Sequence, residues 1–181
     1  MMFKTLAHDF YVQPMNQVYF EAVSMFIIWT ALIFLLRGKA RRIVAGAGFA
    51  LAFALIIVFT VFGRKAGEKG ELRLIPFITF QMGKRNPEFY RALFMNFLLF
   101  MPFGLSLPFA LPQKAKLKPL VTIVSGFALS VFVEAVQYFA KIGECETDDV
   151  LMNTLGVAAG VMSFVIVGAV SKRFNGNSYK P

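Results

Sequence analysis

Residues 119–170 read PLVTIVSGFALSVFVEAVQYFAKIGECETDDVLMNTLGVAAGVMSFVIVGAV. Two apolar stretches, near 119–140 and 150–170, flank a short acidic connection. Each stretch is long enough to cross about 30 Å of hydrocarbon as a helix, which rises about 1.5 Å per residue. Neither stretch shows the alternation of apolar and polar residues that is typical of membrane strands. The segment therefore predicts two neighbouring membrane-spanning helices that pack antiparallel.

The composition of the chain extends this prediction to the remaining sequence. Of the 181 residues, 57% are apolar or aromatic and 16% are charged, and the mean hydropathy is +0.64. A soluble domain of this size exposes too much surface to bury so many apolar side chains. Three further apolar stretches lie near 18–36, 43–63 and 92–111. We therefore predict an all-α, polytopic integral membrane bundle of about five transmembrane helices, with residues 1–181 forming a single membrane domain.

The basic residues fall mainly on one side of the predicted membrane. Basic runs at 37–42 and 114–118 and in the C-terminal tail share one side, whereas the charges of the other side nearly cancel. The positive-inside rule then places the N-terminus outside and the C-terminus in the cytoplasm. Residues 64–91 become a long extracytoplasmic loop. Because the topology accounts for the net charge of +9, we expect no nucleic-acid partner.

Two residue counts exclude several kinds of chemistry. The single Cys145 excludes an intramolecular disulfide and a multi-cysteine metal cluster. The single His8 excludes mechanisms that require two histidines, such as HExxH zinc hydrolysis.

Polar side chains within the spans gather toward their predicted outer ends. A polar group in hydrocarbon is costly, so each one is a candidate for function. Glu134, Gln137 and Lys141, at positions i, i+3 and i+7, share one helix face, as do Asp149 and Asn153, four residues apart. The candidate site residues are Thr60, Arg64, Asn96, Glu134, Gln137, Asp148, Asp149 and Asn153.

These residue types suit an anionic ligand at the membrane surface. The carboxylates are candidate catalytic groups, acting as general acid and base or, for Glu134 and Asp149, holding a divalent cation. Arg64 would bind phosphate. The predicted substrate-binding residues are Thr60, Arg64, Asn96, Gln137 and Asn153.

Structural roles account for some of the same residues. Asp148 and Asp149 would also complement the positive N-terminus of a helix. An ion pair with Arg64 or Lys141 would explain a buried Glu134.

Two further motifs predict packing. Gly156 and Gly160, four residues apart, would let another helix approach closely and provide a helix–helix contact. In the 64–91 loop, Leu74-Ile-Pro-Phe77 is too short to span and predicts an interfacial or re-entrant segment.

Three motifs follow one another along the chain: Asn96-Phe-Leu-Leu-Phe-Met-Pro-Phe-Gly104, Glu134-Ala-Val-Gln137, and Asp149-Val-Leu-Met-Asn153-Thr-Leu-Gly156. Their ordered combination resembles the VanZ-like family of small polytopic membrane proteins, over a region from about 60 to 160. The resemblance implies a bacterial plasma membrane protein. Some members of that family are associated with reduced susceptibility to the glycopeptide teicoplanin. It implies no established reaction.

Three classes of function fit these observations. We favour a site at the outer membrane face that binds or acts on a membrane lipid, a lipid-linked cell-envelope precursor or another anionic envelope molecule. The sequence does not separate an enzyme from a binder. A small transporter or channel subunit ranks lower, because the candidate polar residues stop in the outer half of the spans. A non-catalytic assembly partner is supported by the Gly156 and Gly160 face.

The predicted orientation can be tested with a reporter that is active only in the cytoplasm. We expect activity when it is fused after Pro181 or inserted within 112–118, and silence when it is inserted within 141–149. Reporter activity within 141–149 would show that the orientation is the opposite of the predicted one and that the polar residues lie on the cytoplasmic side.

Overall fold

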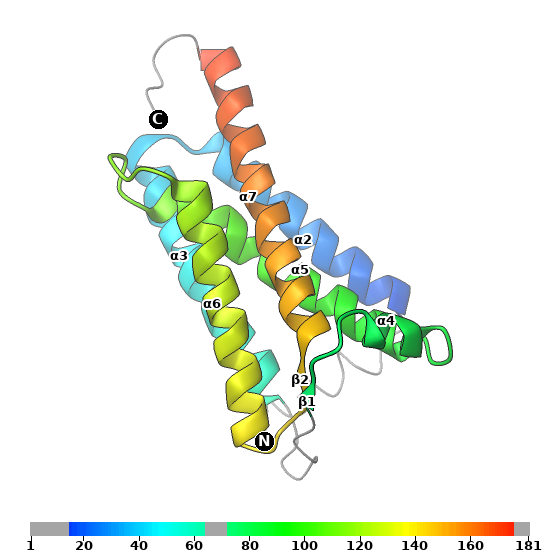
Figure 1. Ribbon diagram of the computed structural model, residues 1–181. Helices are drawn as coiled ribbons and strands as arrows, with labels where there is room; N and C mark the ends of the chain where they lie inside the picture. The colour runs from blue at the N-terminus through cyan, green and yellow to red at the C-terminus, as the bar shows by residue number, and fades with distance from the viewer. Residues whose placement is uncertain (1–14, 64–71, 176–181) are drawn as a thin grey trace.

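The computed structural model describes residues 15–63 and 72–175 and is dominated by long helices (Figure 1). In chain order the elements are α2 (Met15–Leu35), α3 (Gly38–Ile57), the π-helix η1 (Val58–Phe62), β1 (Leu72–Arg73), α4 (Ile78–Gly83), α5 (Glu88–Ala110), α6 (Lys118–Phe139), β2 (Cys145–Glu146) and α7 (Thr147–Asn175).

Each of the five predicted spans coincides with a long helix, so the all-α membrane fold is confirmed. Four helices are long and apolar enough to cross a membrane, and α2 adds the shorter apolar helix Tyr19–Leu35. The four are Gly38–Phe62, Glu88–Ala110, Lys118–Phe139 and Thr147–Ser171. Helix α7 begins at Thr147, before the predicted span, because acidic residues favour the first turn of a helix.

Helix α5 lies at the centre of the bundle and packs most extensively against α7. A Cβ atom at Gly156 would collide with the carbonyl oxygen of Phe97, and one at Gly160 with that of Met101. Gly104 of α5 makes the reciprocal approach to α7. Glycines thus bring the two backbones into contact, and α5 is the helix that packs on the predicted Gly156 and Gly160 face.

Four helices meet in one apolar core next to this contact. Phe100 of α5 is fully buried with Ile56 of α3, Val133 of α6 and Val157 of α7. Helix α6 also packs on α7, as predicted for neighbours joined by a short connection. The core fixes the rotation of each helix about its axis, and therefore which polar residues face inward.

The short strands lie together at one end of the bundle, which we call the strand end (Figure 1). Here α6 and η1 end and α5 and α7 begin, and β1 pairs with β2 in parallel. Between β1 and α4, the side chains of Leu74, Ile75 and Phe77 are exposed. An apolar, exposed segment therefore precedes a short helix, and its place at the membrane interface stays a prediction.

The opposite end is closed by a buried arginine. The guanidinium of Arg41 donates to the carbonyl oxygens of Leu36 (2.7 Å) and Phe34 (3.0 Å), and to Oγ of Ser171 (3.3 Å). A positive charge at the C-terminus of a helix interacts favourably with the helix dipole. Arg41 therefore stabilises the turn between α2 and α3 and ties it to α7.

The Gly156→Ala variant is expected to lose about 1–3 kcal/mol of stability, because its methyl group must push the backbone of α5 away. Gly168→Ala in the same helix is the matched control, since a Cβ atom there has no neighbour within 4 Å in the part of the chain that the structure describes. Thermal unfolding of the purified protein in detergent measures both. Equal melting temperatures for the two variants would show that α5 and α7 separate without cost.

Candidate functional site

The strand end is held together by a pairing between distant parts of the chain. Leu72 pairs with Cys145 and Arg73 with Glu146. The guanidinium of Arg73 also forms ion pairs, with Nη2 2.7 Å from Oε1 of Glu144 and Nη1 3.0 Å from Oε1 of Glu146. The loop before α5 is therefore attached to the connection between α6 and α7.

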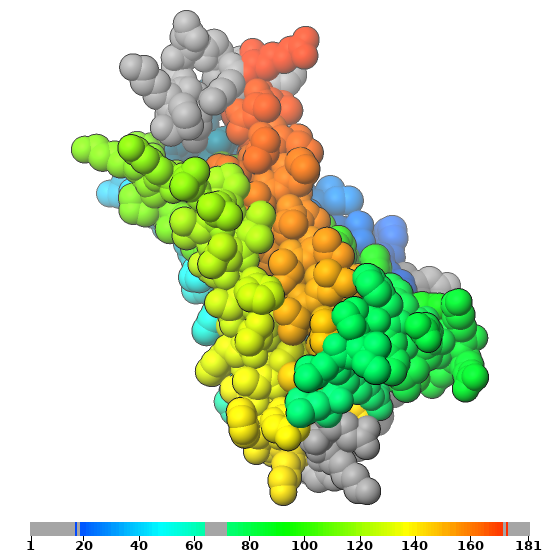
Figure 2. Space-filling view, in the orientation of Figure 1, coloured from blue at the N-terminus to red at the C-terminus, as the bar shows by residue number. Residues whose placement is uncertain are grey.

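The side chain of Asp148 holds the same loop by hydrogen bonds to the backbone of the loop. Its Oδ1 accepts a hydrogen bond from the Phe77 N–H (2.6 Å) and its Oδ2 accepts one from the Thr79 N–H (2.8 Å). The Thr79 hydroxyl donates to Oε2 of Glu146 (2.7 Å). Figure 2 shows this loop packed over the start of α7. Asp148 is 1% exposed, and its two backbone partners give the buried carboxylate a structural role.

Glu134 lies buried beneath this connection. Only 2% of the residue is exposed, and its Oε2 accepts a hydrogen bond from the Glu146 N–H (2.9 Å). Asp149, the second residue of the acidic pair, is also buried, with 7% exposed. The structure therefore places the two carboxylates of the predicted cation site in the interior at the strand end.

Gln137 connects the site to the π-helix. Its Nε2 donates to the backbone carbonyl of Thr60 (2.9 Å), while the Thr60 hydroxyl donates to the carbonyl of Ile56 (2.6 Å). Thr60 and Gln137, both predicted site residues, are thus in direct contact and both buried.

Two buried amide oxygens have no hydrogen-bond partner among the described residues. Asn153 donates from Nδ2 to Oγ of Ser130 (2.8 Å), which leaves its Oδ1 as an acceptor. Gln137 likewise retains Oε1 as an acceptor. A buried acceptor without a donor costs roughly 1–3 kcal/mol. Both oxygens therefore favour a molecule that carries hydrogen-bond donors.

The pKa of the Cys145 thiol is affected by the burial and by the negative charges of this region. Burial raises the pKa of Cys145 above its usual value, and the nearby charges of Glu134, Asp149 and Glu146 raise it further. The thiol therefore stays protonated near neutral pH, and a protonated thiol is a weak nucleophile.

Other predicted residues lie elsewhere. Arg64 falls outside the described residues, so its predicted pairing with Glu134 is not described. Asn96 lies partly buried on α5 and lines a pocket between helices. Lys141 does not extend the Glu134 face, because α6 ends at Phe139 and Lys141 is an exposed, left-handed residue (φ 54°). That part of the prediction is wrong, since the chain reverses there.

Metal binding by Glu134 and Asp149 stays a prediction. Across residues 15–63 and 72–175, no group of three or more His, Cys, Asp or Glu side chains is arranged to hold a metal ion.

Buried polar residues also extend further along α6 than the candidate set indicates. Thr122, Ser130 and Glu134 lie on one buried face at intervals of a helical turn or two, together with Gly126. Ser130 receives the hydrogen bond from Asn153, so it belongs to the site. Its position four residues before Glu134 is a signal from which the sequence could have identified it.

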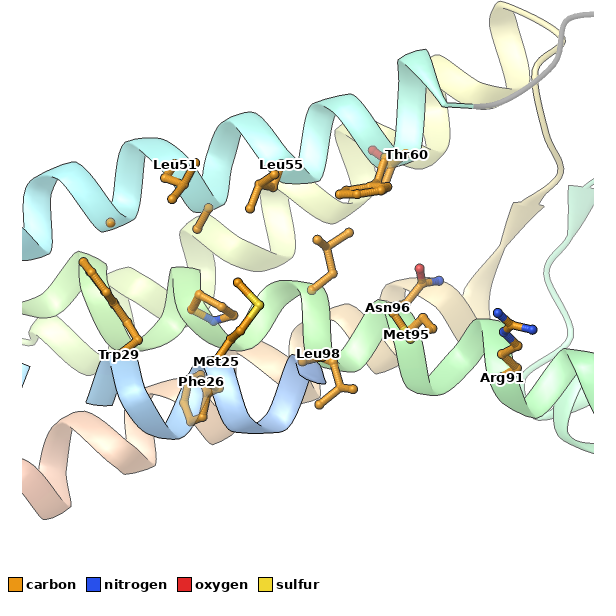
Figure 3. A pocket seen from close by; sticks show the side chains of 16 residues that line it. Met25, Phe26, Trp29, Leu51, Leu55, Thr60, Arg91, Met95, Asn96 and Leu98 are labelled. Carbon is orange, nitrogen blue, oxygen red and sulfur yellow. The ribbon is translucent and has the colours of Figure 1, made fainter. Parts of the chain in front are cut away.

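A pocket with a volume of about 280 Å³ lies between α2, α3, η1 and α5 (Figure 3). Most of its lining is apolar, and Thr60, Arg91 and Asn96 are the polar exceptions. Figure 3 shows these three toward one end of the pocket and Trp29 toward the other. Arg91, which is buried, is a residue that the sequence analysis did not select.

Comparison with known proteins agrees with the motifs at this site. The sequence model of the VanZ/LLP1 family matches residues 22–168, a range that contains the whole candidate set from Thr60 to Asn153. No curated protein and no solved structure matches the chain. Because the match covers most of the chain, this multi-pass membrane protein belongs to the VanZ/LLP1 family.

Proposed function

We propose that the protein binds an anionic, lipid-linked molecule of the bacterial cell envelope at the outer face of the plasma membrane. The observation that carries the proposal is the pair of buried acceptors, Oε1 of Gln137 and Oδ1 of Asn153, in the same end of the bundle as two buried carboxylates. Acceptors in such an environment bind hydroxyl or N–H donors, which sugar and peptide headgroups carry.

The acidic residues divide between two roles. Asp148 and Glu146 hold the loop before α5 through backbone and side-chain hydrogen bonds. Glu134 and Asp149, which are also buried, are the groups that contact the headgroup in this proposal, as hydrogen-bond acceptors or as a general acid and base. Binding of the headgroup requires only the acceptor role and no acid–base chemistry.

The anionic part of the ligand would lie nearer the basic residues of the strand end. Arg91, which is buried on α5, is such a residue, whereas Arg64 lies outside the described residues. A guanidinium recognises phosphate through paired hydrogen bonds. A protein that holds an envelope precursor in this way would alter susceptibility to glycopeptides such as teicoplanin, which is the phenotype that we propose for it.

The Asn153→Leu variant is expected to retain at least tenfold less co-purified envelope lipid than the unmodified protein, because it removes an acceptor and leaves the headgroup donors unpaired. Glu134→Gln should lose a similar amount, since it removes the charge and keeps the shape. Mass spectrometry of lipid extracted from equal amounts of purified protein measures the loss.

Ser163→Ala on α7 is the control, because among the described residues the hydroxyl of Ser163 bonds to the carbonyl oxygen of Ala159 in its own helix. It should retain lipid normally. Normal retention by both site variants, with membrane abundance unchanged, would refute the proposal. Teicoplanin susceptibility of cells that express each variant provides an independent measurement of the same loss.

A further inference from the structure

We propose that the pocket between α2, α3 and α5 holds one hydrocarbon chain of a phosphate-bearing lipid, with the phosphate bound by Arg91. The inference rests on the proposed function in one respect, because it places the headgroup of that lipid beside the polar site. It adds a place for the hydrocarbon chain and a test of Arg91 as the residue that selects the charge of the headgroup.

The lining of the pocket suits a hydrocarbon chain. Met25 and Phe26 of α2, Leu51 and Leu55 of α3 and Met95 of α5 are among its apolar residues. Flexible methionine side chains adapt to chains of different shape. At the far end the pocket is bounded by Trp29, whose Nε1 donates to Oγ of Ser106 (3.0 Å) and is therefore already satisfied. A chain in this pocket meets no unpaired donor from Trp29.

The pocket is placed to receive its occupant from the bilayer. Leu51 and Leu55 line it and are also exposed on the surface of a membrane-spanning helix, at 59% and 38%. Met25 of α2 is 70% exposed. Because these side chains face both the pocket and the outside of the bundle, a lipid chain can enter sideways from the hydrocarbon.

Charge complementarity selects the headgroup. Figure 3 shows Arg91 at the end of the pocket that also carries Asn96 and Thr60. The guanidinium is nearly buried, with 8% of the side chain exposed, and Nη1 lies 3.8 Å from the carboxylate of Glu88, which is 67% exposed. A phosphate that shares the buried side of the guanidinium would form shorter, paired hydrogen bonds.

Thr60 connects the pocket to the polar site. It lines the pocket, and its backbone carbonyl accepts the hydrogen bond from Gln137 (2.9 Å). A headgroup bound at Arg91 and Thr60 therefore contacts a residue that is itself hydrogen-bonded to Gln137. Oε1 of Gln137 has no partner in the described part of the chain. One lipid can fill the pocket with its chain while its headgroup lies on the side of Thr60 that contacts Gln137.

The single tryptophan of the chain makes the inference measurable. Trp29 lines the pocket, so a bromine atom on a bound chain quenches its fluorescence. The probe is dodecyl phosphate brominated near the end of its chain, added to the purified full-length protein in a neutral detergent. We expect saturable quenching that unbrominated dodecyl phosphate reverses. The same brominated chain with a trimethylammonium headgroup should need at least a tenfold higher concentration.

Two variants test the two parts of the pocket. Arg91→Gln should raise the half-quenching concentration of the phosphate probe about tenfold or more, the effect expected for a lost charge-assisted hydrogen bond. Ala22→Phe places a ring in the pocket and should abolish saturable quenching. Arg85→Gln is the matched control: Arg85 is exposed just before α5 and does not line the pocket, so its loss should change the concentration less than twofold.

The outcomes separate this inference from the proposed function. Non-saturable quenching, or equal quenching by the phosphate and ammonium probes, would overturn the inference whether or not Arg91→Gln folds. In that case a loss of lipid retention in Asn153→Leu would leave the proposed function intact. Conversely, saturable and phosphate-selective quenching with normal lipid retention in both Asn153→Leu and Glu134→Gln would support the pocket and refute the polar site. An equal loss of binding in Arg85→Gln and Arg91→Gln would show a surface-charge effect and overturn the role of Arg91.

Discussion

The backbone contact between α5 and α7 is the constraint on which the rest of the structure depends. In lipid the hydrophobic effect does not drive helices together, so close packing has to supply the attraction. Gly156 and Gly160 provide it by admitting the carbonyl groups of Phe97 and Met101. The contact fixes the position of α7 against the central helix, and with it the place of Asp149 and Asn153 at the strand end.

The acidic residues of the strand end can be buried because most of them have defined structural partners. A carboxylate without a partner in the interior would be strongly destabilising. The carboxylate of Asp148 accepts hydrogen bonds from two backbone N–H groups. The carboxylate of Glu146 accepts them from the side chains of Arg73 and Thr79. Glu134 in turn accepts the backbone N–H of Glu146. The site therefore depends on the loop, which supplies hydrogen-bond donors to Asp148 and Glu146.

Much of the fold and part of the site could be predicted from the sequence, because hydropathy and helical spacing are local signals. They identify the five helices, the packing face of Gly156 and the shared face of Glu134 and Gln137. The parallel pairing of β1 with β2 could not be predicted, because two-residue strands leave no periodic pattern. The place of Asn96 depends on how α5 is rotated by its contacts with other helices, which sequence spacing along α5 alone does not contain.

The π-helix explains how one short segment serves two surfaces. In η1 the N–H of Gly63 donates to the carbonyl of Val58 (2.7 Å), five residues back, and the wider turn alters which backbone groups face the neighbouring helix. Thr60 uses its hydroxyl for the carbonyl of Ile56, and its own carbonyl accepts from Gln137 of α6. Residue Thr60 therefore borders the apolar pocket on one side and orients a site amide on the other. Because η1 ends at Phe62, the carbonyl of Thr60 lies in the last turn, where its i+4 donor would fall beyond the helix, and the end of this helix is therefore where the pocket and the polar site meet.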